Sequence, residues 1–161
     1  MPQNPHPSQV DDASAAVAWV IKNIAQYGGD QKRIYVGGHS AGGHLAAYVG
    51  LNHRFWPELK GVIALSGVYD VSKIAGFKDD PVNASPIQHI SAGAPPFLIT
   101  YCENDYPSLP VQAREFHAAL RKAGVASELV YVPGENHISE IVNVYKDDDL
   151  TARSILKFLA E

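Results

Sequence analysis

Cysteine is almost absent from this sequence. The 161 residues include one, Cys102, so no disulfide can form within the chain. A chain without disulfides suits a reducing compartment, and we expect a cytoplasmic location. Cys102 itself is expected to be a buried residue near the end of a strand. No apolar run approaches the roughly 20 residues that a membrane-spanning helix needs, so we expect no membrane partner. Residues 1–9 are polar and proline-rich, unlike a signal peptide.

Positive charge is also scarce. Thirteen Lys and Arg residues stand against 17 Asp and Glu, a net charge of −4. This composition offers no basic surface, so nucleic acid is not an expected partner. Four histidines lack a partner at metal-ligand spacing: His6, His53, His89 and His117. We therefore expect neither a metal site nor a cofactor. The acidic run at 147–149 lacks the spacing and the glycine of a calcium loop, and it is typical of the start of a helix.

Short apolar runs alternate with longer amphipathic segments along the chain. Strands are predicted at residues 32–36, 60–66, 96–101 and 127–132. Helices are predicted at residues 10–26, 40–52, 109–123 and 149–160. This alternation favours right-handed crossovers and a parallel sheet, an α/β fold with about four parallel strands flanked by helices. Hydrophobic residues make up 46% of the chain and no linker divides it, so we expect one minimal domain over residues 1–161.

One segment interrupts the alternation. Residues 71–94 contain Pro81 and Pro86 and show no regular periodicity, so we expect a lid-like loop over the site. A short helical turn is predicted to begin at Ser85 and Pro86, because serine is a good capping residue and proline suits a first helical position.

The most informative motif is G-x-S-x-G at residues 38–42, which read GHSAG. It follows a predicted strand and opens a predicted helix, the context of a nucleophile elbow that presents a serine hydroxyl above a sheet. The sharp bend at Ser40 favours glycine two residues before and two residues after it. Gly37 and Gly43 extend the small-residue zone, so that helix and strand can pack closely.

A serine nucleophile needs a base and a group that orients this base. Asp105 follows the predicted strand 96–101, and His137 follows the strand 127–132. Both lie where loops leave the carboxyl ends of parallel strands, the side on which such sheets bind ligands. The order of serine, acid and histidine agrees with the α/β type of hydrolase. Asp70, just after the strand 60–66, remains an alternative acid.

These residue types predict acyl transfer. Ser40 is expected to attack an acyl carbonyl, His137 to carry the proton, and Asp105 to hold and stabilise the imidazole. The backbone N–H of Ala41 is the expected oxyanion donor, and water then releases the acyl group.

Other polar and aromatic residues near these loops have simpler explanations. Packing or hydrogen bonding is favoured for His39 and His44. Glu103 is expected to be solvated or to support the site indirectly, and Glu135 to lie on the surface. Three residues beside the catalytic loops either line an acyl pocket or pack ordinarily: Tyr69, Tyr106 and Ile138.

Together, residues 36–46 (VGGHSAGGHLA) and 65–70 (LSGVYD) resemble carboxylesterases of the hormone-sensitive-lipase and feruloyl-esterase-like (BD-FAE) groups. They are also similar to arylformamidases of the same superfamily. The similarity runs from about residue 10 to the C-terminus and implies a truncated α/β-hydrolase fold. Members of these groups are roughly twice as long, and their first half supplies several strands and a His-Gly-Gly-Gly-type loop that donates further oxyanion N–H groups. No such loop occurs in this sequence, so the source of a second donor is open.

The resemblance implies that the elbow strand, central in the family, is an edge strand in this chain. An open apolar edge invites pairing, so we expect a homodimer that covers it. The leading functional hypothesis is a serine carboxylesterase that acts on small-molecule acyl esters. The alternatives are an arylformamidase-type amidase and a catalytically silent half-domain that acts through association.

Overall fold

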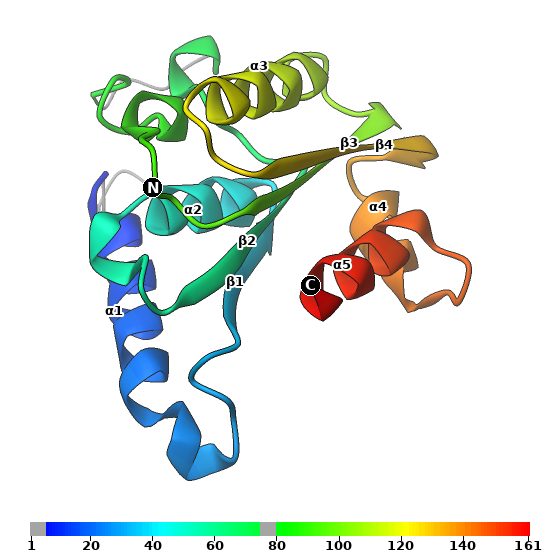
Figure 1. The fold of residues 1–161 in the computed structure, drawn as a ribbon. Helices are drawn as coiled ribbons and strands as arrows, with labels where there is room; N and C mark the ends of the chain where they lie inside the picture. Colours follow the sequence, from blue (N-terminus) through cyan, green and yellow to red (C-terminus); the bar gives the residue numbers. More distant parts are fainter. Residues whose placement is uncertain (1–5, 75–79) are drawn as a thin grey trace.

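A four-stranded parallel sheet forms the centre of the computed structural model, which describes residues 6–74 and 80–161 (Figure 1). The strands are β1 (Ile34–His39), β2 (Leu59–Leu65), β3 (Phe97–Asn104) and β4 (Ser127–Asn136). Their spatial order is β1-β2-β3-β4, and every neighbouring pair is parallel. The predicted α/β class and parallel sheet are confirmed. β1, which carries the G-x-S-x-G motif at its end, is an edge strand as expected.

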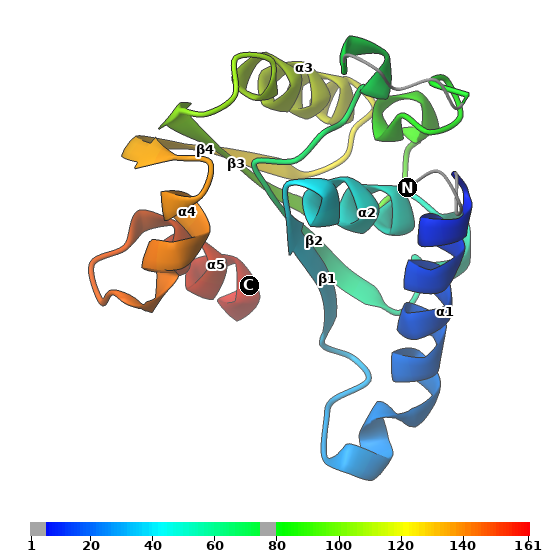
Figure 2. The ribbon, with the colours of Figure 1, turned by 180° about the vertical axis from the view of Figure 1, so that it is seen from behind.

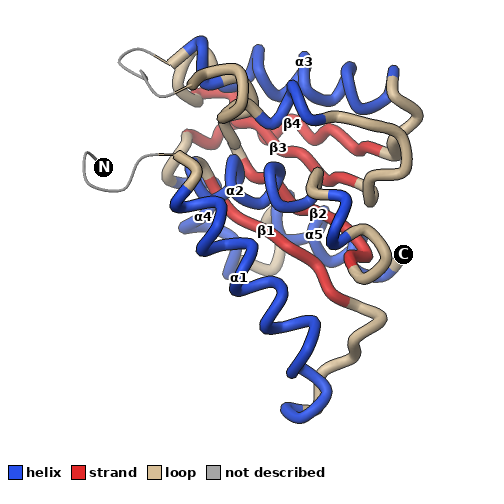
Figure 3. Tube along the Cα trace, turned by 90° about the vertical axis from the view of Figure 1, so that its left-hand side faces the viewer, coloured by secondary structure: helices blue, strands red, loops and turns tan. Residues whose placement is uncertain are grey.

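Helices cover both faces of this sheet (Figures 1 and 2). The longer ones are α1 (Ser8–Asn23), α2 (Ala41–Gly50), α3 (Leu109–Lys122) and α5 (Leu150–Ala160), and α4 (Ser139–Val142) is a single turn. Helices α1, α2 and α3 lie on one face, and α5 packs on β3 and β4 from the other (Figures 1 and 3). Across the described residues, no helix is both long and apolar enough to cross a bilayer.

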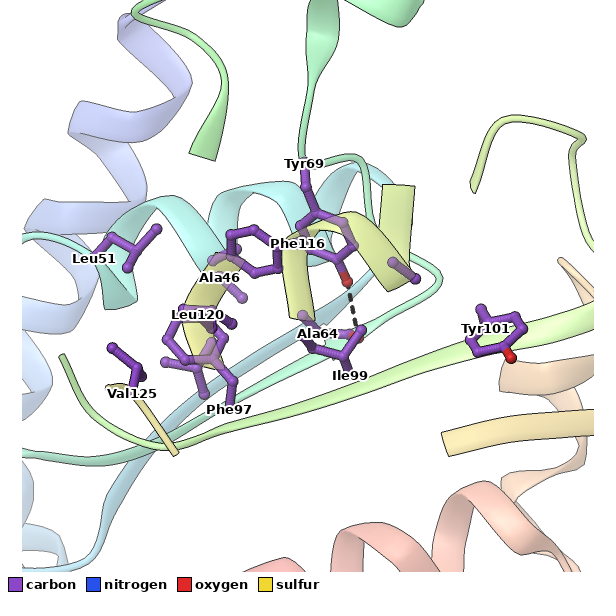
Figure 4. Close-up of a cluster of buried hydrophobic side chains, with 13 residues drawn as sticks. Ala46, Leu51, Ala64, Tyr69, Phe97, Ile99, Tyr101, Phe116, Leu120 and Val125 are labelled. Carbon is purple, nitrogen blue, oxygen red and sulfur yellow. Dashed lines mark hydrogen bonds between the residues drawn. The ribbon is translucent and has the colours of Figure 1, made fainter. Parts of the chain in front are cut away.

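The period-2 alternation of the strands divides the core between the two faces. In β2, Val62 and Ala64 belong to the larger cluster under α2 and α3, whereas Ile63 and Leu65 face Phe158 of α5. Figure 4 shows the larger cluster, in which rings and aliphatic side chains of β3 and α3 pack together. Both faces of β2 are buried, as the continuous apolar run at 60–66 indicates for a central parallel strand.

The C-terminal ends of β3 and β4 extend further than the sequence predicts. We expected β4 to stop at residue 132, but it continues through Pro133 and Gly134 to Asn136. Proline is tolerated there because β4 is an edge strand, and Gly134 has a φ of 76°. The pairing register shifts between Cys102 and Asn104, so that Asn104 is opposite Asn136. Glu103 was expected to be solvated or to support the site indirectly. Its carboxylate accepts a hydrogen bond from the Gly134 N–H at 2.7 Å.

The segment 71–94 is largely irregular, as predicted, with two short 3-10 turns at Val71–Lys73 and Pro86–His89. Residues 75–79, part of the expected lid, lie outside the described residues. The turn predicted at Ser85 and Pro86 is present, but the Ser85 side chain does not cap it. Its hydroxyl accepts from the Val71 N–H and donates to the Pro81 carbonyl. Three further 3-10 turns lie at Ile24–Tyr27, His53–Phe55 and Asn143–Tyr145.

Candidate active site

Ser40 occupies a sharp bend between β1 and α2. Its backbone has φ 58° and ψ −119°, a strained conformation for a residue other than glycine. The Ser40 N–H donates to the carbonyl of Leu65 at 2.9 Å, and the Ser40 carbonyl accepts from the His44 N–H at 3.0 Å. The bend is therefore fixed to the end of β2 on one side and to the first turn of α2 on the other.

The glycines around this bend are not equally constrained. A Cβ at Gly38 would lie 2.4 Å from the backbone C and O of Gly42, which no arrangement of side chains can relieve. A Cβ at Gly43 would lie 3.0 Å from Cα of Gly67, so the close packing expected there is present. At Gly42 itself, a Cβ would meet nothing within 4 Å in the described part of the chain. The expected requirement for glycine at 42 is therefore wrong, because only the first glycine of the motif is crowded.

The structure brings Ser40, His137 and Asp105 together. His137 Nε2 lies 2.8 Å from Ser40 Oγ, and His137 Nδ1 lies 2.7 Å from Asp105 Oδ1. Each residue directly follows a strand: Ser40 follows β1, Asp105 follows β3 and His137 follows β4. Because parallel strands end at the same edge, residues 97 positions apart in the chain meet in one hydrogen-bonded row.

The row is shielded from water at its acidic end. The Asp105 side chain is fully buried and the His137 side chain is 9% exposed. An ionised carboxylate only accepts hydrogen bonds, so Nδ1 carries the proton toward Asp105 and Nε2 is left to accept from the Ser40 hydroxyl. Asp105 Oδ1 also accepts the Tyr106 N–H at 2.8 Å, while Oδ2 has no protein partner within residues 6–74 and 80–161. The geometry therefore suits a tautomer in which Nε2 can accept a proton.

Asp70, the alternative acid, is placed elsewhere. Its Oδ1 accepts hydrogen bonds from the N–H and the hydroxyl of Ser72, and its Oδ2 lies 3.8 Å from Nζ of Lys73. Asp70 therefore caps the 3-10 turn Val71–Lys73, and the carboxylate that contacts His137 belongs to Asp105.

Two aromatic rings lie close to the His137 ring. The His39 ring centroid is 4.5 Å from that of His137, and the Tyr106 ring centroid is 4.8 Å away. Tyr106 and Ile138 are both exposed, at 60% and 58%. Tyr69, in contrast, is fully buried and stacks on Phe116 at 4.3 Å, and its hydroxyl donates to the Ala64 carbonyl (Figure 4). It belongs to the core and not to a pocket wall, because its ring packs between β2 and α3.

An apolar cavity of about 210 Å³ opens beside the first residue of α2. Its lining residues are Ala41, His44, Val68, Val71 and Ile74. His44 Nε2 bonds to the carbonyl of Ala84 at 2.7 Å, and Tyr48 bonds to the carbonyl of Asn83, so α2 anchors the segment around residue 84. Burial lowers the pKa of His44, partly offset by this hydrogen bond. The packing role favoured for His44 agrees with these contacts.

One buried carboxyl group near the site was missed by the sequence analysis. Glu140 of α4 is fully buried and bonds to hydroxyls of Ser66 and Thr100. The available signal was Asn136, whose Oδ1 accepts the N–H groups of Ile138 and Ser139. An asparagine here indicates a turn after His137 but carries no information about the burial of Glu140. Cys102 is buried as expected, and burial raises the pKa of its thiol.

The chain is similar in sequence to several known hydrolases. The BD-FAE family model matches residues 1–76. LipM of Mycobacterium tuberculosis, a probable carboxylic ester hydrolase, is 30% identical over 99% of this chain and 44% of its own length. The esterase LipQ of the same organism is 32% identical over 95% of this chain and 44% of its own length. Kynurenine formamidase of Danio rerio is 26% identical over 94% of this chain and 57% of its own length.

The fold is shared with solved esterases as well. The esterase of Pyrobaculum calidifontis superposes with a TM-score of 0.79 at 24% identity, covering 99% of this chain and 61% of that one. The chain therefore has the α/β-hydrolase fold, as the geometry of the elbow and the strands indicates. Its sequence is similar to those of esterases, in agreement with the resemblance of the residues around Ser40. It spans less than half the length of LipM and LipQ.

Proposed function

We propose that this chain carries the active site of a serine carboxylesterase that cleaves small acyl esters without a cofactor. The observation that carries the proposal is the unbroken hydrogen-bonded row from Ser40 Oγ through His137 to Asp105, at 2.8 Å and 2.7 Å. These distances lie in the range that proton transfer to a general base requires. The esterase relatives support the same reaction type.

In the proposed reaction, Ser40 Oγ attacks the acyl carbon while its proton moves to His137 Nε2. Asp105 remains ionised and stabilises the imidazolium that forms. When the tetrahedral intermediate collapses, the bond to the leaving oxygen breaks and Nε2 returns the proton to that oxygen. Water then repeats both steps on the acyl-enzyme, which frees the carboxylic acid and restores Ser40.

The Ala41 N–H is proposed as an oxyanion donor. Ala41 is the first residue of α2, where backbone N–H groups have no intrahelical acceptor and where the helix dipole favours negative charge. An N–H at this position faces charge that develops on the carbonyl oxygen during attack by the neighbouring serine.

The apolar cavity beside Ala41 is proposed to hold the acyl chain. Its volume of about 210 Å³ and its lining by Val68, Val71 and Ile74 suit a short aliphatic group. Each buried methylene contributes about 0.8 kcal/mol until the cavity is full, so rates are expected to rise from acetate to butyrate and then to fall for long chains.

Amide cleavage by the same three residues is the second candidate. The match to kynurenine formamidase, over 94% of this chain, favours an N-formyl substrate as the alternative. A formyl group needs no acyl cavity, so an arylformamidase would show no gain from acetate to butyrate. Comparing N-formylkynurenine with these esters therefore separates the two activities.

We also propose that two copies of the chain associate along β1. The edge of β1 has no neighbouring strand within the described residues, and Gly37 on it is exposed. Unpaired N–H and C=O groups at such an edge pair readily with another strand. Association without catalysis is the third hypothesis, in which the chain is a silent half-domain.

The test is hydrolysis of p-nitrophenyl acetate, butyrate and decanoate by the purified protein, with Ser40→Ala and Ser91→Ala beside it. Ser91 is a partly exposed serine that bonds to His53, so it serves as a matched control. We expect a loss of at least about 10³-fold in Ser40→Ala and none in Ser91→Ala. Equal rates in the wild type and Ser40→Ala would overturn the esterase proposal and favour the silent half-domain.

A further inference from the structure

Glu140 lies in an unusual place for a carboxylic acid. Its side chain is fully buried at the carboxyl edge of the sheet, on α4, three residues after His137. A buried carboxylate is costly unless hydrogen bonds replace the water that it loses. The reaction described above uses no group at this position, so the residue requires another explanation.

Both oxygens of Glu140 are satisfied by hydroxyl groups from neighbouring strands. Oε2 accepts from Ser66 Oγ at 2.6 Å, and Oε1 accepts from Thr100 Oγ1. Ser66 directly follows β2 and Thr100 lies in β3, and both hydroxyls are buried. The Ser66 N–H also donates to the Thr100 carbonyl at 3.2 Å. Glu140 therefore attaches α4 to the end of β2 and to the middle of β3 at once.

This attachment connects the loop of His137 with the elbow of Ser40. Leu65, the residue before Ser66, accepts the hydrogen bond of the Ser40 N–H. On the other side, the turn that contains Glu140 is closed by a bond from the Val142 N–H to the Ile138 carbonyl at 3.1 Å. Glu140 is thus linked to Ser40 through Ser66 and Leu65, and to His137 through its own turn.

The other bonds of this turn are local. Asn136 caps the N–H groups of Ile138 and Ser139, and the Ser139 hydroxyl accepts the Asn136 N–H. These contacts shape the turn but do not attach it to the central strands. His137 directly follows β4, an edge strand that contains Pro133 and Gly134, so its position depends on what holds the turn after it.

We propose that Glu140 is a positioning residue, which holds His137 within hydrogen-bonding range of both Ser40 and Asp105. The inference rests on the proposed hydrolase function. A displacement of about 1 Å at a general base lowers turnover by roughly 100-fold, because the reacting atoms leave their aligned geometry. Glu140 does not line the cavity beside Ala41, so we expect little change in the binding of the acyl group.

The test compares Glu140→Ala with Glu140→Gln. The glutamine side chain is isosteric with glutamate, and its amide oxygen accepts one hydroxyl while its amide nitrogen donates to the other, since serine and threonine hydroxyls both donate and accept. We expect kcat of Glu140→Ala to fall about 10- to 100-fold with KM within about twofold, and Glu140→Gln to recover most of kcat. Glu128→Gln, a surface change at the opposite end of β4, is the control.

A second readout does not depend on turnover. The Nδ1–H proton of His137, which bonds to Asp105, gives a low-field NMR resonance when it is protected from exchange. We expect this resonance in the wild type and Glu140→Gln and its loss in Glu140→Ala, measured well below the melting temperature of each protein. A folded Glu140→Ala that retains both kcat and the resonance would overturn the proposal.

Two further outcomes are also decisive. If Glu140→Ala does not fold, Ser66→Ala removes one donor only, and an unchanged kcat in that variant overturns the proposal. If the wild type hydrolyses neither esters nor N-formylkynurenine, the proposed function fails, and the NMR comparison alone then decides whether Glu140 positions His137.

Discussion

Asp105 and Asp70 are matched side chains that follow neighbouring strands, and only Asp105 contacts His137. Changing Asp105 to Asn replaces an acceptor by a group that can donate to Nδ1, which favours the tautomer with a proton on Nε2. We expect kcat to fall by about 10⁴-fold with the fold intact. Turnover of p-nitrophenyl butyrate, with circular dichroism to verify folding, measures this.

Asp70→Asn is the control for that prediction. It alters the cap of Val71–Lys73 and leaves the row from Ser40 to Asp105 untouched, so activity within about threefold of the wild type is expected. The reverse ranking of the two variants would mean that Asp70 is the catalytic acid.

A second pair of matched residues lies at the elbow itself. Gly38→Ala introduces a Cβ 2.4 Å from the backbone of Gly42, so we expect it to lower the free energy of unfolding by more than about 2 kcal/mol. Gly42→Ala meets no atom within 4 Å in the described part of the chain and lies in α2, so stability should be unchanged or rise by up to about 1 kcal/mol. Urea unfolding of both variants measures the difference, and equal losses contradict the assignment of strain to position 38.

Among the elements, the attachment of residues 83–84 to α2 is expected to depend on pH. Burial lowers the pKa of His44 in the folded protein below its usual 6.5. The unfolded chain therefore binds a proton at a higher pH than the folded chain does, and stability falls as the pH drops below about 6.5. In His44→Gln, whose amide can also donate to Ala84, this fall should be shallower.

The measurement is the free energy of unfolding in urea from about pH 8 to pH 5. Burial also lowers the pKa of His117, so His117 too makes the protein less stable at low pH. This contribution is the same in the wild type and in His44→Gln. The difference between the two curves therefore reports His44 alone, and parallel curves would contradict the prediction.

Sequence patterns predict best the elements with a clear hydrophobic periodicity or with a motif between a strand and a helix. The strand, elbow and helix around Ser40 follow from an apolar run, a G-x-S-x-G motif and an amphipathic stretch, and all three are present. The end of β4 was misjudged, because Pro133 and Gly134 are typical of a turn and only the edge position of β4 allows them in a strand. The edge position follows from the order of the strands in space.

Contacts between distant residues were the least predictable part of the site. That Asp105, and not Asp70, contacts His137 depends on where β3 ends, which local patterns left open between two acids. Glu140 was missed for the same reason, since its partners Ser66 and Thr100 are 74 and 40 residues away in the chain. Local propensity carries no information about such hydrogen bonds.

At the scale of the whole molecule, the open edge of β1 predicts association. We expect sedimentation velocity to show dimers whose fraction rises with protein concentration, because pairing at an edge obeys mass action. A strictly monomeric protein at high concentration would contradict pairing along β1. The same samples should unfold in one cooperative transition if residues 1–161 form a single domain.

The strand order β1-β2-β3-β4 also has a consequence for biosynthesis. Each strand pairs with the one made just before it, so a chain leaving the ribosome can extend the sheet strand by strand. Ser40 is then folded into its elbow early, whereas His137 directly follows β4, which is made after the other three strands. A nascent chain that ends before β4 therefore holds Ser40 in its elbow without its hydrogen bond to His137. Under the proposed function, Ser40 becomes a competent nucleophile only after His137 and the turn of Glu140 have been made.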